Sequence, residues 1–203
     1  MVLPDLIKNA DKTWNFHPEK NEHLFIGNKN HEAILKGWKR HLMVDQIFHD
    51  ADFFKYHQHQ IKLLIRKSLK GSTVKPFFIG HISLELLLDS LLLTENIIQP
   101  TPFYNYLDQV NEQELSSFLS LNDLENTEKF FKFFTMFKKE QYIFSYAKPE
   151  NITYAIKRIC MRLWKDPFTN EQEDALTQSL INYKNELADK FIFIFEVIDA
   201  EIN

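Results

Sequence analysis

The chain has 203 residues, of which 44% are hydrophobic and 26% are charged, and its formal net charge is −4. The length and these proportions are typical of one globular domain, and the negative net charge gives no argument for a general electrostatic attraction to nucleic acid. The length predicts one domain over residues 1–203. The single cysteine, Cys160, excludes an internal disulfide and a thiolate zinc cluster, so we expect the protein to be cytoplasmic.

Two features predict that the chain is neither exported nor embedded in a membrane. The first residues, MVLPDLIKNADK, contain no basic region followed by an apolar stretch, so no signal peptide is expected. No segment reaches the roughly 20 uncharged apolar residues of a membrane-spanning helix.

Hydrophobic residues recur at helical spacing along most of the chain, and no segment shows the alternation of a strand. The four glycines and seven prolines also leave little material for the turns of an all-β fold. We therefore predict an all-α, single-domain helical bundle. Helices are expected over about 3–9, 30–47, 51–70, 76–95, 103–123 (as one or two), from Thr127, over 151–164 and over 170–200.

The breaks between these helices have local signals. Residues 10–29 are polar and are expected to be loop. Gly71 suits the end of a helix. The Pro100-Thr101-Pro102 run and Pro149 are expected to interrupt the chain, with Asn151 capping the helix that follows.

Two short stretches place metal-ligand residue types at every fourth position. The first stripe is His41, Asp45 and His49, and the second stripe is His81, Glu85 and Asp89. On a helix such positions lie above one another on one face. Their surroundings are rich in apolar residues, where charges are costly to bury unless they are paired or hold a cation. Two facing stripes predict a metal site with nitrogen and oxygen ligands.

Each stripe also has an alternative interpretation. The first stripe fits a partly exposed helix with local His–Asp pairs. The second stripe interrupts an otherwise apolar helix, and salt bridges or a solvent-facing position would also explain it. Because each stripe supplies ligands that the other lacks, the two together favour a metal site. Asp5, beside apolar residues, is either a further ligand or the cap of its short helix.

Two groups of basic residues are candidates for contacts with an anionic substrate or partner. They are Lys62, Arg66, Lys67, Lys70 and Lys75 in one stretch, and Arg158 and Arg162 four positions apart in another. The first group would steer an acidic partner, or it is a solvated face. The second would clamp a phosphate, or it pairs with the acidic C-terminal helix.

The remaining histidines and Cys160 give weaker signals. His57 and His59 point to different faces of a helix, and we expect both at the surface. His17, His23 and His31 are candidates only for a peripheral role in the site. Cys160 is expected to be a small buried side chain. No nucleophile elbow, phosphate-binding glycine loop or dinucleotide fingerprint occurs.

The string GWKRHLMVDQIFHDADFF resembles the G-x-x-x-H-x-x-x-D segment of the acyl-carrier-protein phosphodiesterases, or ACP hydrolases. LELLLDSLLL resembles the acid-containing helix that follows in that family. FKKEQYIFSYAKPENITYAIKRICMR resembles its aromatic stretch followed by spaced arginines, and YKNELADKFIFIFEVI resembles its closing run of Tyr, Leu and Phe. These short motifs follow the family's order over most of the chain.

The resemblance implies an HD-like fold of the metal phosphohydrolase superfamily. It also implies a divalent cation, typically Mn²⁺ with Fe or Zn as alternatives, and release of 4′-phosphopantetheine from holo-acyl carrier protein. By position, His41, Asp45, Asp89 and Asp5 match the family. The chain begins almost at the matching acid, so we expect either a start further upstream or a branch that lacks this wall of the site.

The resulting hypothesis assigns a role to each candidate. The metal ligands would be drawn from Asp5, His41, Asp45, His49, His81 and Asp89. Asp45 or Glu85 would hold or deprotonate the attacking water, and Arg158 or Arg162 would neutralise charge on the phosphate. The basic stretch would receive the carrier protein. The alternatives are a non-enzymatic helical protein that binds a protein or a lipid-like ligand, and an HD-like hydrolase of a nucleotide or phospholipid.

Overall fold

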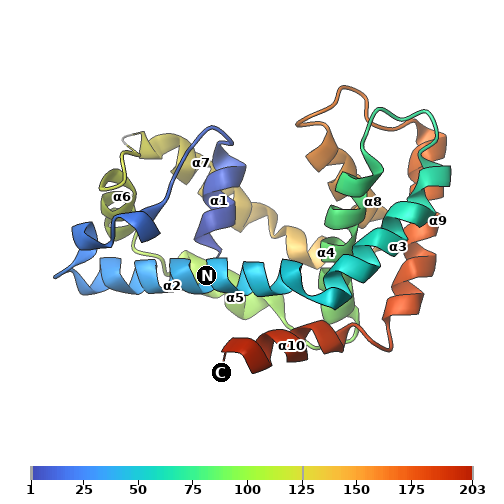
Figure 1. Ribbon diagram of the computed structural model, residues 1–203. Helices are drawn as coiled ribbons and strands as arrows, with labels where there is room; N and C mark the ends of the chain where they lie inside the picture. Colours follow the sequence, from blue (N-terminus) through green and yellow to red (C-terminus); the bar gives the residue numbers. More distant parts are fainter. Residues whose placement is uncertain (1, 125, 203) are drawn as a thin grey trace. The chain divides into compact units, whose positions relative to one another are not determined.

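The computed structural model describes residues 2–124 and 126–202, and this part of the chain is helical and contains no strand (Figure 1). The all-α helical-bundle prediction is confirmed. The α-helices are α1 (Leu3–Ala10), α2 (Lys29–Asp50), α3 (Asp52–Ser68), α4 (Pro76–Thr94), α5 (Pro100–Asp108), α6 (Glu112–Ser120), α7 (Thr127–Glu140), α8 (Pro149–Cys160), α9 (Asn170–Leu187) and α10 (Ile192–Ile202). Short 3-10 helices are η1 (Pro18–Lys20), η2 (Glu22–Phe25) and η3 (Tyr142–Ala147).

Prolines begin helices at two places where breaks were predicted. Pro100 and Pro102 lie in the first turn of α5, and Pro149 is the first residue of α8. A proline is tolerated there because the first N–H groups of a helix have no partner within it. Asn151 therefore lies inside α8, and its predicted role as the cap is wrong.

Three further boundaries differ from the prediction. The expected loop over 10–29 contains the two short helices η1 and η2. Helix α3 ends at Ser68, and Gly71 lies beyond its cap with a φ of +86°. The single helix expected over 170–200 is divided by a turn at 188–191. Phe191 in this turn is buried, and Ile194 and Ile198 are the buried residues of α10 that follow it.

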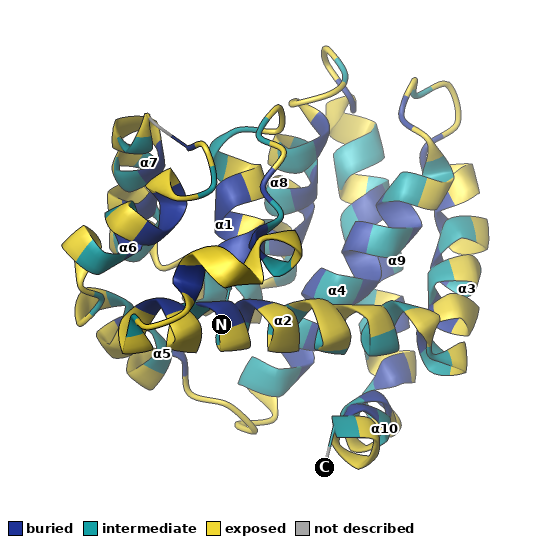
Figure 2. Cartoon of the chain, turned by 60° about the vertical axis from the view of Figure 1, so that its left-hand side comes forward, coloured by how far each residue is buried: buried dark blue, intermediate teal, exposed yellow. Residues whose placement is uncertain are grey.

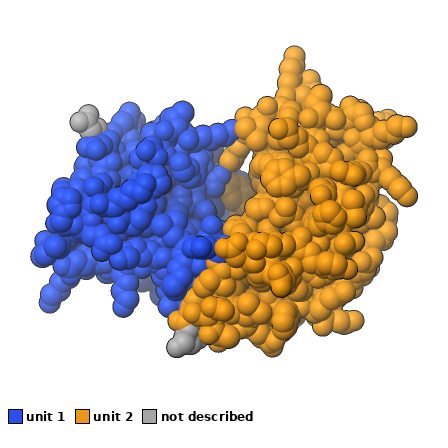
Figure 3. Space-filling view, viewed as in Figure 1, with its two compact units in different colours: residues 1–46, 101–141 blue, residues 47–100, 142–203 orange. Residues whose placement is uncertain are grey.

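The contacts gather the residues into two compact units (Figure 3). Unit 1 comprises Met1–Gln46 and Thr101–Gln141, and unit 2 comprises Ile47–Pro100 and Tyr142–Asn203. Both units are assembled from separate segments of the sequence, and the boundary at 46/47 falls within α2. The assignment of 1–203 to one domain stays a prediction.

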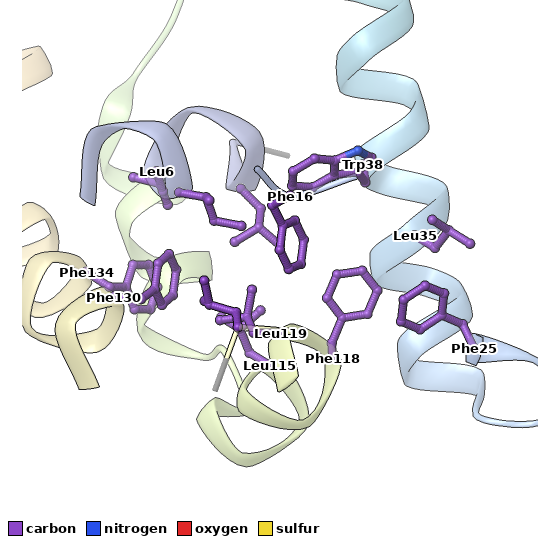
Figure 4. Close-up of a cluster of buried hydrophobic side chains, with 13 residues drawn as sticks. Leu6, Phe16, Phe25, Leu35, Trp38, Leu115, Phe118, Leu119, Phe130 and Phe134 are labelled. Atoms are coloured by element: carbon purple, nitrogen blue, oxygen red, sulfur yellow. The ribbon is translucent and has the colours of Figure 1, made fainter. Parts of the chain in front are cut away.

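Unit 1 has an aromatic core (Figure 4). Phe25 and Phe118 are stacked with 4.5 Å between their ring centroids, and Phe16 packs edge-on against Trp38. Phe130 lies at the opposite end of this cluster from Phe25 (Figure 4). Eight of the 19 phenylalanines are buried, so a substantial part of the high phenylalanine content serves packing.

Helix α4 forms the centre of unit 2, where it packs against α3, α8 and α9 (Figure 1). Gly80 allows the close approach of α3, because a β-carbon there would lie 2.8 Å from the backbone oxygen of Gln58. By length and mean hydropathy, α4 is the one described helix that could cross a membrane. However, 56% of its apolar 18-residue stretch is buried, as in the core helix of a bundle.

Candidate metal centre

The second stripe is the partly exposed edge of α4. His81, Glu85 and Asp89 are half-buried, whereas the intervening residues from 82 to 88 are buried. Their four-residue spacing puts them on one face of the helix, as the sequence predicts. A core helix therefore carries one line of ionisable side chains that keeps limited access to solvent.

His49, in the last turn of α2, joins this edge. Its Nε2 lies 3.0 Å from Oε1 of Glu85, and Nε2 of His81 lies 3.1 Å from the same oxygen. Of the first stripe, His49 therefore reaches the second stripe, and its contact with Glu85 links α2 to α4.

Neighbouring side chains fix the orientation of the two imidazoles. Nδ1 of His81 lies 3.2 Å from Oε1 of Gln58 on α3. The buried Phe54 packs edge-on against both rings, with centroid separations of 4.7 Å to His49 and 5.1 Å to His81. Polar and aromatic partners of this kind are what hold metal-binding imidazoles in place.

The charges of the cluster are strongly coupled. Burial alone would raise the pKa of Glu85, but hydrogen bonds from His49 and His81 outweigh it and bring the pKa down to about 2. Burial raises the pKa of Asp89 to about 6, and the negative charge of Glu85 adds to this effect. The edge of α4 thus carries one firmly ionised carboxylate, Glu85, and a second carboxyl group, Asp89, whose ionisation is disfavoured by burial and by the charge of Glu85.

The donor set and its spacing fit a divalent cation. One ligand atom from each of His49, His81 and Glu85 lies within 4.8 Å of the other two. Metal–ligand bonds of about 2.1 Å at right angles separate two donors by about 3 Å, the distance from the Glu85 oxygen to each imidazole nitrogen. Two imidazoles and a carboxylate suit Zn, Fe or Mn. Without a cation, the same distances are those of a hydrogen-bonded triad.

The rest of the first stripe belongs to unit 1. His41 pairs there with Asp5, with 3.5 Å between Nε2 and Oδ2. Asp45 is exposed and precedes His49 by four residues on α2. The proposal that Asp5, His41 and Asp45 share one site with the second stripe stays a prediction. The N-cap of α1 is Val2, so the capping role considered for Asp5 is wrong; its charge instead favours the first turn.

The basic stretch begins beside the cluster. Gln58, Lys62 and Arg66 follow one another at four-residue steps on α3 and therefore share a face. The β-carbon of Lys62 lies 3.2 Å from the position that a β-carbon on Gly80 would occupy, next to His81. Arg66 is exposed, as are the remaining members of the group, Lys67, Lys70 and Lys75.

The two arginines predicted to clamp a phosphate are not on one helix. Arg158 is exposed in the last turn of α8, whereas Arg162 lies beyond its end. The helix stops at Cys160, whose carbonyl accepts hydrogen bonds from the backbone N–H groups of Leu163 and Trp164. The i, i+4 geometry expected for this pair is therefore wrong. Cys160 is buried, as expected, and burial raises the pKa of its thiol to about 12.

The sequence prediction missed the burial of His57. His59 is exposed as expected, but only 6% of His57 is exposed, and its Nδ1 lies 2.7 Å from the hydroxyl of Tyr183. Burial lowers the pKa of His57 to about 4, and the charge of Lys190 adds to this effect. A signal was present: His57 lies at helical spacing from the apolar Phe54 and Ile61, on the buried face of α3.

Comparisons of the chain with protein-family models, curated proteins and solved structures return no match. The likeness to the ACP hydrolases therefore rests on the short motifs in the sequence. The three-residue cluster in unit 2 provides a separate basis for considering function.

Proposed function

We propose that this protein is a metal-dependent phosphodiesterase of the ACP hydrolase type, with its cation held by His49, His81 and Glu85. The observation that carries the proposal is the convergence of three nitrogen and oxygen donors from two helices within 4.8 Å. The motifs around His41 and Asp45 add the family resemblance, which favours Mn²⁺ over Fe or Zn.

The residues around the cluster suit this role. A bound divalent cation would supply a water of lowered pKa and polarise a phosphoryl oxygen. Gln58 would keep the ring of His81 oriented, and Phe54 would shield one side of both imidazoles from water. Asp45, four residues before His49 on α2, is the residue that the resemblance assigns to hold or deprotonate the water.

The neighbouring charges favour an anionic substrate. Lys62 packs beside Gly80, next to His81, and Arg66 continues the same face of α3. Figure 2 shows exposed residues along α3, the helix that carries Arg66 and Lys67, and both of these residues are exposed. Positive charge beside a metal centre attracts phosphodiesters and acidic proteins. Holo-acyl carrier protein, which presents 4′-phosphopantetheine, meets both descriptions, and Arg158 would add positive charge in the same unit.

The first experiment is elemental analysis of the full chain after reconstitution with Mn²⁺, Fe²⁺ or Zn²⁺. Wild type and His59→Ala, an exposed histidine on α3, should retain near-stoichiometric metal, while His81→Ala and Glu85→Gln should lose it. Metal that persists in both of these variants would disprove the assignment. His41→Ala and Asp89→Ala are added to test whether the rest of the two stripes contributes ligands.

The second experiment measures release of 4′-phosphopantetheine from holo-acyl carrier protein by the metal-loaded protein. Asp45→Asn should abolish release without changing the helical circular dichroism signal. Stoichiometric metal with no release would reject the carrier protein and direct the search to nucleotides or phospholipids. Absence of metal in the wild type would instead favour the hydrogen-bonded triad and a non-enzymatic binding protein.

A further inference from the structure

A pocket of about 610 Å³ opens into the core of unit 1. Its walls come from several helices of that unit and are mostly apolar. Leu6, Leu115, Phe130 and Phe134, which belong to the buried cluster of Figure 4, also line the pocket, together with Ile34 and Leu107. Close-packed cores contain few voids larger than a water molecule, whereas small-molecule sites span about 300–1,000 Å³. The pocket has the size and lining of a ligand site.

The polar part of the lining is small and carries one sign of charge. Among the lining residues, Glu114 is the only Asp, Glu, Lys, Arg or His, and the other polar side chains are Asn30, Asn111 and the hydroxyl of Tyr106. The side chain of Asn111 is occupied as the N-cap of α6, where it accepts hydrogen bonds from the N–H groups of Gln113 and Glu114. Glu114 is therefore the group best placed to recognise the polar end of a ligand.

The polar contacts of the Glu114 carboxylate are long. Its Oε2 is 3.5 Å from Nδ2 of Asn28 and 3.6 Å from Nε2 of His31, and neither contact involves Oε1. His31 is buried, and its Nε2 makes no hydrogen bond in the described part of the chain. Buried polar atoms without hydrogen bonds are uncommon in native proteins. Beside this edge of the pocket, the carboxylate of Glu114 thus lies next to one buried imidazole nitrogen that makes no hydrogen bond.

We infer that the pocket binds an amphiphile with an aliphatic or aromatic body and a protonated amine as its head group. The apolar walls would take the body, and the amine would donate hydrogen bonds to Glu114. A fatty carboxylate of equal length would place a second negative charge beside Glu114 and is disfavoured. This inference concerns unit 1 and is independent of the metal cluster in unit 2.

The test is isothermal titration calorimetry of the full chain with decylamine, decanol and decanoate. We expect one saturable site for decylamine, with binding at least about tenfold tighter than that of decanoate. Octylamine should bind roughly fifteenfold more weakly than decylamine, because it lacks two methylenes and each buried methylene contributes about fourfold. Failure of all three ten-carbon probes to bind saturably would overturn the proposal, as would equal binding of the amine and the carboxylate.

Matched variants separate the pocket from surface binding of detergent-like molecules. Glu114→Gln should remove the preference for the amine while decanol binding is kept. Glu112→Gln, in the same first turn of α6 but outside the lining, should leave the preference intact. A preference that survives in Glu114→Gln would overturn the assignment of the head group.

A second pair of variants tests the body of the pocket. Leu107→Trp should fill it and weaken all ten-carbon probes at least about tenfold, whereas Leu121→Trp, a partly exposed leucine outside the lining, should leave their binding unchanged. The melting temperature of each variant establishes that it is folded. Unchanged binding in folded Leu107→Trp would contradict the proposed location.

Discussion

The imidazole rings of His49 and His81 are stacked, with 4.8 Å between their centroids and 13° between their planes, although they come from different helices. Both direct Nε2 towards the same oxygen of Glu85. The carboxylate therefore joins the last turn of α2 to the middle of α4. Since 37% of the Glu85 side chain is exposed, this junction is open to exchange with ions from solution.

Divalent metal should stabilise the folded protein through this junction. A ligand that binds only the native state at 100 times its Kd raises the free energy of unfolding by about 2.7 kcal/mol, which is roughly 5–10 °C in melting temperature for a chain of this size. Scanning calorimetry with and without Mn²⁺ or Zn²⁺ measures the shift. His81→Ala should show none and His59→Ala the full shift; an equal shift in His81→Ala would place the metal elsewhere.

The buried His57 should make stability depend on pH. Its pKa is about 4 in the folded chain and about 6.5 when unfolded. Between these values the unfolded state binds the proton and the folded state does not, so the free energy of unfolding falls as pH falls from 6.5 to 4. Below 4 this residue contributes no further loss. The full contribution is on the order of 3 kcal/mol.

Urea unfolding of His57→Gln isolates this contribution. Glutamine retains an acceptor for the hydroxyl of Tyr183 but does not titrate, so the difference from the wild type should change between pH 6.5 and 4. Other titrating groups cancel in that difference. His59→Gln, on the exposed side of α3, should parallel the wild type throughout, and a parallel curve for His57→Gln would refute the prediction.

Gly80→Ala should destabilise the protein, although alanine normally favours a helix by about 1 kcal/mol over glycine. The added β-carbon would meet the backbone oxygen of Gln58 at 2.8 Å, and a backbone atom of a packed helix cannot move aside locally. Overpacking of this kind costs about 1–3 kcal/mol, so a net loss of about 1 kcal/mol is expected in urea unfolding. A gain in stability would show that α3 and α4 can separate at no cost.

Ser83→Ala should have the opposite outcome on the same helix. Its hydroxyl is fully buried and makes no hydrogen bond in the described part of the chain. Removing an unsatisfied polar group is expected to leave the stability unchanged or raise it by up to about 1 kcal/mol. Thermal unfolding tests this, and a loss of more than about 1 kcal/mol would indicate a buried water bound to the hydroxyl.

Local patterns in the sequence predicted what one helix alone determines. The spacing of His81, Glu85 and Asp89 placed them on one face of an apolar helix, and Pro76 marked where that helix begins. The effects of Pro100 and Pro149 were harder to predict, because a proline interrupts a helix that precedes it but can begin a helix that follows it.

Features that depend on distant segments could not be derived from spacing. The contact between His49 and Glu85 requires the turn after α2 and the packing of α3 against α4. The partner of His57 is Tyr183, far along the chain, so only the apolar spacing around His57 could have indicated its burial. The pocket in unit 1 depends on how neighbouring helices of that unit fail to fill their shared core, which no local pattern records.

The division of both units into separated segments sets an order for folding during synthesis. Helix α1 packs against α7, so the core of unit 1 is completed only when residues 127–140 have been made. Helix α4 is synthesised before α8 and α9, which cover it, and its leucines stay accessible on the ribosome until those helices follow. We therefore expect the yield of the protein in cells to respond to the supply of chaperones that shield apolar segments.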